Sequence, residues 1–224
     1  MLRLFAGRLF PFVLGTLFCV GIFALPLYAA DSAPEGKTLK ILTYNIRIAV
    51  GNGERDYNVA ENPRGYDAIA RVITSLDCDV VGLQEVDRGT RRSAGHNQIE
   101  ELAKRTGMIP TFGAAIPLPG MEEGKPGEYG IAILSKQQPL SVKVVPLPGQ
   151  EERRALLIAE FDDFVFFNTH FSLTPASRLE SMAIVNAERA QWTKPVLLVG
   201  DFNFQEVRER TGRDFPFVRG PLES

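Results

Sequence analysis

The chain has 224 residues, of which 45% are hydrophobic, and a formal net charge of −2. This length and apolar content suit one domain with a sizeable core. The slightly acidic balance argues against a strong generic attraction to nucleic acid, although a local basic patch remains compatible with it.

The first 30 residues have the pattern of a secretory signal peptide. Arg3 and Arg8 form a basic start, residues 9–27 are nearly continuously apolar or small, and Ala29 offers a small residue for cleavage. The run is long for a signal and short for a comfortable membrane span, so an uncleaved anchor is the alternative. We therefore expect an exported protein, periplasmic or secreted, with a membrane-anchored form as the alternative.

After cleavage, residues 31–38 form a polar linker and residues 39–224 form the domain. Of the two cysteines only Cys78 then remains, so no internal disulfide is possible, and we expect Cys78 to be a small core residue.

The first elements follow from apolar spacing. Alternation over residues 39–45 predicts a strand that ends at Asn45, and residues 49–62 read as a loop. Pro63 suits the first turn of a helix that Asn62 caps. Apolar residues recur there at helical spacing: Ile69, Val72, Ile73 and Leu76. A second short strand covers residues 80–85 and ends at Glu85.

The middle of the chain is richer in proline and glycine. Asn97 and Glu100 resemble a capping box, which predicts a helix that stops near Gly107. Residues 110–127 contain many Pro and Gly residues, so we expect an irregular segment with at most one short strand.

Four further strands are expected at residues 130–135, 140–145, 156–161 and 165–170. Asp162-Asp163 predicts a tight hairpin between the last two. Pro175 opens a helix that runs to about Trp192 and carries Leu179, Met182 and Val185 on one face, and residues 196–199 form the next strand. The pattern predicts an α+β protein built on two packed sheets.

Polar residues follow several of the apolar strands. In Gly200-Asp201-Phe202-Asn203, strand alternation places Asp201 and Asn203 on one face and Phe202 on the other. A carboxylate can serve as a base, and an amide can orient a water or a phosphoryl oxygen.

Taken singly, each of these polar residues has an ordinary structural explanation. Asn45 fits a turn residue, Glu85 a solvated strand end, His170 a core histidine and Asp201 a loop cap. Together they predict one cleft where strands emerge, with hydrolytic chemistry.

Five segments that contain these residues resemble the endonuclease/exonuclease/phosphatase superfamily, the Mg²⁺-dependent enzymes related to DNase I. They occur in the family's order, at residues 42–46, 81–86, 129–135, 168–171 and 200–203. The resemblance implies a four-layer α/β sandwich, in which two mixed sheets pack face to face between outer helices.

The resemblance also implies roles for single residues. Glu85 and Asn45 would hold Mg²⁺, or Mn²⁺, with oxygen ligands that suit a hard cation. Asp201 would position or deprotonate the attacking water, and Asn203 would orient the phosphate. His170 would contact the phosphate on the leaving-group side and could protonate the leaving group, because an unperturbed histidine suits either role at neutral pH.

The activity implied is metal-dependent hydrolysis of a phosphodiester or phosphomonoester by an activated water. The alternative is an impaired family member that binds phosphorylated ligands without turnover. The substrate stays open among small molecules, lipids and nucleic acids, and the export signal and acidic charge favour a smaller or lipid-linked phosphoester. Oligomeric state is not indicated.

Two segments bear on substrate choice. Arg88, Arg91 and Arg92 follow Glu85 and form either a phosphate-binding loop or a solvated charged loop. The apolar residues 110–119 either contact a lipid or cover the core.

One family element is not found in this sequence. The family carries an Asp-His pair on or after a final strand, whereas the two histidines here are His96 and His170, and residues 207–224 show no strand pattern. We therefore expect the last strands to be missing, which leaves three explanations open: a fragment or frameshifted product, an impaired variant, or completion by a partner.

Overall fold

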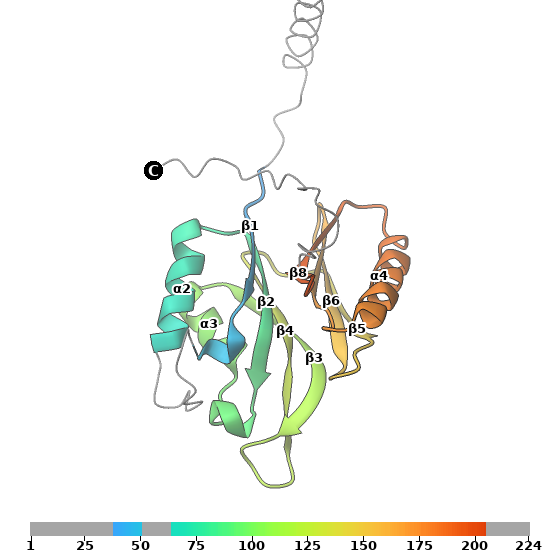
Figure 1. Cartoon of the computed structure of the whole chain (residues 1–224). Helices are drawn as coiled ribbons and strands as arrows, with labels where there is room; N and C mark the ends of the chain where they lie inside the picture. The colour runs from blue at the N-terminus through green and yellow to red at the C-terminus, as the bar shows by residue number, and fades with distance from the viewer. Residues whose placement is uncertain (1–37, 51–63, 205–224) are drawn as a thin grey trace, which may run out of the picture. The chain divides into compact units, whose positions relative to one another are not determined.

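The computed structural model describes residues 38–50 and 64–204, drawn in colour in Figure 1. The chain divides into two units, Met1–Thr38 and Leu39–Ser224, and all described secondary structure belongs to the second. The signal peptide, most of the linker, the helix cap at Asn62 and Pro63, and the tail after residue 204 lie outside the described residues.

The described elements follow the expected order with few exceptions. They are β1 (Ile41–Asn45), η1 (Arg47–Ala49), α2 (Arg64–Leu76), β2 (Val80–Arg88), η3 (Arg91–Ser93), α3 (Gln98–Thr106), β3 (Ile109–Pro119), β4 (Pro126–Ser135), β5 (Ser141–Leu147), β6 (Arg154–Glu160), β7 (Val165–His170), α4 (Pro175–Arg189) and β8 (Val196–Asp201). None of the helices in this part of the chain is long and apolar enough to cross a membrane.

The strands form two mixed sheets of four strands each. The first has the order β1-β2-β4-β3, with β1 and β2 parallel and the other pairs antiparallel. The second has the order β5-β6-β7-β8, with β7 and β8 parallel and the other pairs antiparallel. Each parallel pair is joined through a helix, α2 in the first sheet and α4 in the second, as parallel neighbours require.

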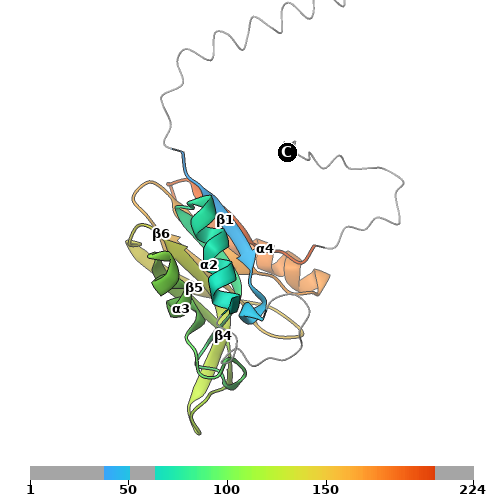
Figure 2. The ribbon, with the colours of Figure 1, turned by 90° about the vertical axis from the view of Figure 1, so that its left-hand side faces the viewer.

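Three apolar clusters stack these elements into four layers, as the resemblance implied. Residues of α2 and α3 pack with one face of the first sheet, and Figure 2 shows both helices over that sheet. The inner faces of the two sheets share a second cluster. The outer face of the second sheet packs against α4 in a third, around Phe167, Phe171 and Val185. Cys78 is buried in the first cluster, as expected.

The expectation for residues 110–127 was wrong. Most of this segment belongs to a long hairpin of β3 and β4, which pair from Ile109↔Ser135 to Pro119↔Pro126. The prediction failed because β3 is an edge strand of the described sheet, where its one strand neighbour is β4, and edge strands tolerate proline. The tight hairpin between β6 and β7 is confirmed, since Phe161 N donates to Phe164 O at 2.9 Å.

Two local expectations for the helices also fail. Asn97 precedes α3, but its side chain makes no capping hydrogen bond. Gln98 anchors this end instead, because its Oε1 accepts from Asp87 N and its Nε2 donates to Ile48 O. On α4, Val185 is buried and Met182 packs against the same cluster, as expected, but Leu179 is 73% exposed and the other buried residues are Ser177 and Ser181.

Candidate active site

Asn45 joins the two sheets at the end of β1. Leu42 and Tyr44 pack into the cluster under α2 and α3, so alternation turns Asn45 toward the second sheet. Its Nδ2 donates to Glu85 Oε1 at 2.7 Å and to Asp201 Oδ2 at 3.0 Å. Its Oδ1 accepts from Arg47 N at 3.0 Å. The amide therefore ties a carboxylate from β2 to a carboxylate from β8.

Glu85 owes its direction to a β-bulge. The pairing of β2 with β4 shifts register between Gln84 and Val86, and Glu85 takes a positive φ of 59°. Leu83 and Val86 lie in the same buried cluster on the helix side, so the bulge adds one residue between them. A bulge can re-aim a side chain next to a site, and here it brings Glu85 to Asn45.

Gly200 allows β8 to lie close to β7. Its φ is +151°, and a Cβ at this position would lie 2.2 Å from the Thr169 carbonyl oxygen. Asp201 follows opposite His170 in the parallel register, and its backbone carbonyl accepts from Phe171 N at 2.8 Å. The end of β7 therefore sets the position of Asp201.

The alternation argument for Asn203 does not hold, because β8 ends at Asp201. Asn203 has a positive φ of 52°, and its backbone N–H donates to Asp201 Oδ1 at 3.0 Å. Its side-chain Nδ2 donates to Phe171 O at 2.8 Å. Asn203 thus fixes the Asp201 carboxylate through its backbone. Phe202 points into the cluster under α4, as expected, edge-on to Phe171.

His170 is buried at the end of β7, beside Asp201 and Arg154. Its Nε2 lies 3.9 Å from Asp201 Oδ2, and its Nδ1 lies 3.3 Å from Nη1 of Arg154. Burial and the Arg154 charge lower the pKa of His170, against the opposing effects of Asp201, Glu85 and Glu151. The ring is therefore neutral at neutral pH and is not the unperturbed histidine that the sequence suggested.

A buried polar pair beneath these residues was missed from the sequence. Gln84 Nε2 donates to Asn168 Oδ1 at 2.7 Å between the sheets and also lies 3.2 Å from Thr43 Oγ1. Both residues lie within the five family-like segments, and a glutamine within the apolar run of β2 was the available signal. Arg154 was missed as well, because its local sequence, Glu151-Glu152-Arg153-Arg154, resembles an ordinary charged turn.

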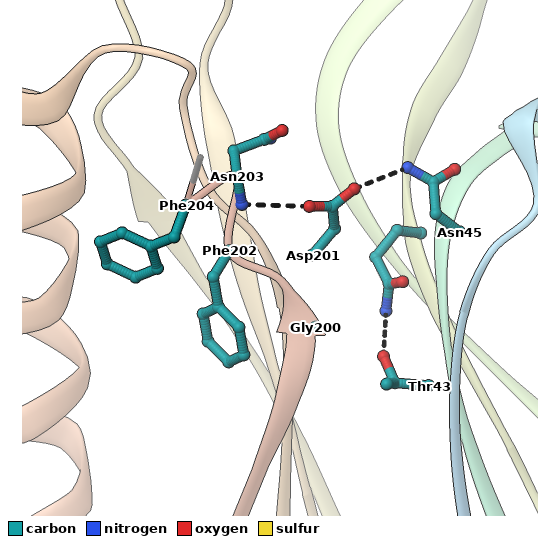
Figure 3. Close-up of a pocket in the computed structure, with 8 residues that line it drawn as sticks. Thr43, Asn45, Gly200, Asp201, Phe202, Asn203 and Phe204 are labelled. Atoms are coloured by element: carbon teal, nitrogen blue, oxygen red, sulfur yellow. Dashed lines mark hydrogen bonds between the residues drawn. The ribbon is translucent and has the colours of Figure 1, made fainter. Parts of the chain in front are cut away.

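The polar residues border one open cleft of about 400 Å³. Thr43, Asn45 and Gln84 line it from the first sheet, and residues 200–204 line it from the second. Figure 3 shows the Asp201 carboxylate between Asn203 and Asn45, with Phe202 and Phe204 turned away from Asn45. The cleft thus lies between β1 and β2 of the first sheet and the end of β8 in the second.

The donor set fits a hard divalent cation that keeps most of its waters. Across residues 38–50 and 64–204 no three His, Cys, Asp or Glu side chains are grouped to hold a metal. Glu85 supplies one carboxylate, and Mg²⁺ sites commonly use only one or two carboxylates. Asn45 presents its Nδ2 to that carboxylate and its Oδ1 to Arg47 N, so it would ligate the cation only after turning its oxygen toward it. Their assignment as metal ligands stays a prediction.

The basic loop after Glu85 is largely neutralised by its own neighbours. Arg92 binds both oxygens of the buried Asp87 at 2.8 Å, and Arg88 pairs with Glu128. Arg91 is exposed. These contacts favour a structural role for Arg88 and Arg92 over phosphate binding.

Comparison with known proteins agrees with this architecture. The model of the Endonuclease/Exonuclease/phosphatase family matches residues 42–221. No curated protein matches the chain. Among solved structures, an endonuclease/exonuclease/phosphatase from Beutenbergia cavernae DSM 12333 is similar with 28% identity and a TM-score of 0.56. The match covers 74% of this chain and 47% of that one, so this chain spans about half of that relative.

Two further structures share the fold. A functionally unknown conserved protein from Enterococcus faecalis V583 has 23% identity and a TM-score of 0.53, over 75% of this chain and 68% of that one. D. rerio TDP2, complexed with a single-strand DNA product, has 17% identity and a TM-score of 0.53. The match covers 75% of this chain and 62% of that one.

Proposed function

Because this chain belongs to the endonuclease/exonuclease/phosphatase family, we propose that it is a metal-dependent phosphoesterase. It would hydrolyse a phosphodiester or phosphomonoester with an activated water. The observation that carries the proposal is the tie between Glu85, Asn45 and Asp201, which joins the two sheets at one cleft.

The geometry supports a division of roles. Glu85 and Asn45 would hold Mg²⁺ or Mn²⁺, which when bound polarises a phosphoryl oxygen and offsets developing negative charge. Asp201 would orient the attacking water and accept its proton, since Asn203 N and Asn45 Nδ2 fix the two carboxylate oxygens. Asn203 would keep Asp201 in place through its backbone N–H, and its side chain, at the same cleft, would orient the phosphate.

The test uses bis(p-nitrophenyl) phosphate and p-nitrophenyl phosphate with the full chain, in Mg²⁺, in Mn²⁺ and in EDTA. We expect turnover that needs metal and falls by at least about 10³-fold in Asp201→Asn. Asp162→Asn, at an exposed aspartate of the β6–β7 turn, is the matched control and should leave the rate unchanged.

A folded protein that binds Mn²⁺ by calorimetry but hydrolyses neither ester would overturn the enzyme proposal. That result would favour the alternative, a family member that binds phosphorylated ligands without turnover. Persistence of the full rate in EDTA would instead refute the metal requirement.

For the substrate class we propose a small or lipid-linked phosphoester. The pairing of Arg88 with Glu128 and of Arg92 with Asp87 offsets two of the three positive charges in the loop after Glu85, and duplex binding normally needs such charge. Because D. rerio TDP2 is complexed with a single-strand DNA product, a single-stranded oligonucleotide belongs in the assay. Faster cleavage of that oligonucleotide than of a phosphorylated lipid headgroup would reverse this choice.

We further propose that residues 1–30 direct export. Expression of the full chain in a bacterial host, followed by N-terminal sequencing of the exported fraction, should place the cleavage near Ala30. A product that stays in the membrane with an intact Met1 would support the anchored form.

A further inference from the structure

We propose that Arg154 is a positioning residue that fixes the proton of His170 on Nε2, so that this histidine donates a hydrogen bond to the substrate. The proposal deepens the proposed function, on which its catalytic part rests. The tautomer itself depends only on the contacts of His170 and can be tested without turnover.

The guanidinium of Arg154 is held rigidly at the start of β6. The residue is 6% exposed. One nitrogen, Nη2, donates to Glu151 Oε1 at 2.9 Å, and Nη1 lies 2.8 Å from Glu152 Oε1. Two carboxylates of the preceding turn therefore set the plane of the guanidinium from both sides.

The Glu151 carboxylate is itself anchored beside His170. Its Oε2 accepts from Ser172 Oγ at 2.8 Å, and its Oε1 accepts from Leu173 N at 2.9 Å. Ser172 and Leu173 lie two and three residues beyond His170, the last residue of β7. The turn before β6 and the chain after β7 thus hold Arg154 against the imidazole.

Hydrogen-bond chemistry then decides the tautomer. A guanidinium carries only donors and does not lose its proton in proteins. Nη1 lies 3.3 Å from His170 Nδ1, so Nδ1 must accept and the single proton of the neutral ring must sit on Nε2. Asp201 Oδ2 is 3.9 Å from Nε2, too far for a hydrogen bond. Nε2 faces Asp201, which lines the cleft, so its proton is left for a group bound beside that carboxylate.

The same contact disfavours a second proton on the ring. A proton on Nδ1 would point at the Arg154 guanidinium, and burial opposes the added charge, whereas Asp201, Glu85 and Glu151 favour it. A neutral imidazole is a good hydrogen-bond donor but a very weak acid. His170 would accordingly donate to a phosphoryl oxygen, most strongly as negative charge builds on that oxygen in the transition state, and would not protonate the leaving group.

The first test is nitrogen NMR of the full chain with histidine labelled in the ring. The chain has two histidines, and His96→Gln removes the other one, which contacts Tyr66. We expect the His170 spectrum at neutral pH to show a fully unprotonated Nδ1 and a protonated Nε2. A protonated Nδ1, or a ring that averages both tautomers, would overturn the proposal without reference to activity.

Variants assign the effect to Arg154. Arg154→Met should give an averaged mixture of tautomers and a higher His170 pKa, whereas Arg153→Met, at the neighbouring arginine in the same turn, should change neither. Arg154→Lys, which keeps the charge but loses the planar fork, should restore part of the pKa depression and not the single tautomer. An unchanged spectrum in a folded Arg154→Met would refute the assignment.

Kinetics separate hydrogen bonding from acid catalysis. We expect Arg154→Met to lower kcat by about 10²-fold with little change in KM, because a misplaced donor acts mainly in the transition state. His170→Gln should slow esters of p-nitrophenol and of a simple alcohol by the same factor. A much larger loss for the alcohol ester, whose leaving group needs a proton, would show that His170 is a general acid and would overturn this part of the proposal.

Discussion

The side-chain amides of Gln84 and Asn168 meet between the two sheets, with Gln84 Nε2 2.7 Å from Asn168 Oδ1. Asn168 Nδ2 donates to the carbonyls of Leu83 and Ala132, so its amide bonds both β2 and β4. Gly82 provides the space for the Asn168 amide, because a Cβ at position 82 would lie 2.9 Å from Asn168 Oδ1. This contact fixes the end of β7, with His170, relative to the bulge of β2 at Glu85. The sequence predicts a strand end at Glu85, but β2 runs on to Arg88.

Asn168→Ala should destabilise the protein strongly. The change leaves the carbonyls of Leu83 and Ala132 and the amide of Gln84 without their buried partner, and each unsatisfied group costs on the order of 1–3 kcal/mol. We expect a loss of about 2–4 kcal/mol in urea-unfolding free energy. Asn186→Ala, at an exposed asparagine of α4, should stay within about 0.5 kcal/mol of the parent, and an equal effect of the two changes would contradict this account.

Gly200→Ala should both destabilise the fold and disturb the site. The new Cβ would collide with the Thr169 carbonyl oxygen at 2.2 Å, so β8 must move away from β7 and take Asp201 with it. We expect the free energy of unfolding, measured by thermal denaturation, to fall by more than about 2 kcal/mol. The rate of hydrolysis should fall as well. Gly124→Ala is the control, because its φ is also positive at +77° but open space surrounds it. It should cost only about 1 kcal/mol and spare activity.

Glu85→Gly should separate stability from function. Glu85 holds a positive φ of 59°, a conformation that costs a non-glycine residue on the order of 1 kcal/mol and glycine little. We therefore expect unchanged or higher stability by urea unfolding, together with loss of Mn²⁺ binding in calorimetry. Ala94→Gly, at a φ of 51°, should match it in stability while binding the metal normally. Marked destabilisation of Glu85→Gly alone would mean that the carboxylate supports the fold.

Glu151 should make stability depend on acid pH. Burial alone would raise its pKa, but hydrogen bonds from Arg154, Leu173 N and Ser172 lower the pKa of Glu151 to about 2. A carboxyl with a lowered pKa in the folded state contributes stability above its unfolded pKa and loses it as pH falls. We expect this contribution to decline from about pH 4.5 to about pH 2.

Urea unfolding across that pH range, compared with Glu151→Gln, isolates the effect. The variant should lose stability at neutral pH and show a flatter acid slope, whereas Glu180→Gln, at an exposed glutamate of α4, should follow the parent. If the unfolding free energy of Glu151→Gln and of the parent fell equally steeply with pH, Glu151 would not be the source of the acid dependence.

The residues that the sequence revealed were those whose position follows from a strand end. Asn45, His170 and Asp201 lie at strand ends, whereas Glu85, expected to end its strand, lies at the bulge inside β2. Hydrogen bonds join Asn45 to Glu85 and to Asp201, and His170 lies beside Asp201. Asn203 lines the same cleft as Asp201, but it does so through a turn with positive φ and not through strand alternation, because β8 stops at Asp201. Local pattern could not show where the strand would end.

What the sequence concealed depends on contacts between distant segments. Arg154 is placed beside the site by its contact with His170 on the neighbouring strand. The sequence of its own turn does not indicate that contact. The edge strand β3 was hidden because its prolines are unfavourable in a central strand and tolerated only at an edge. The contact of Arg154 and the edge position of β3 both depend on the order of strands within a sheet. The spacing of apolar residues along the sequence does not indicate that order.

The bond from Asn45 to Asp201 connects residues 156 positions apart, and this separation bears on how the protein folds. Closing so long a loop is slow and happens only after more local pairings exist. A kinetic intermediate with one sheet formed would hold half of the cleft and bind no substrate. Recovery of function during refolding should therefore lag behind recovery of secondary structure. The length of that delay would measure how long one sheet takes to dock on the other.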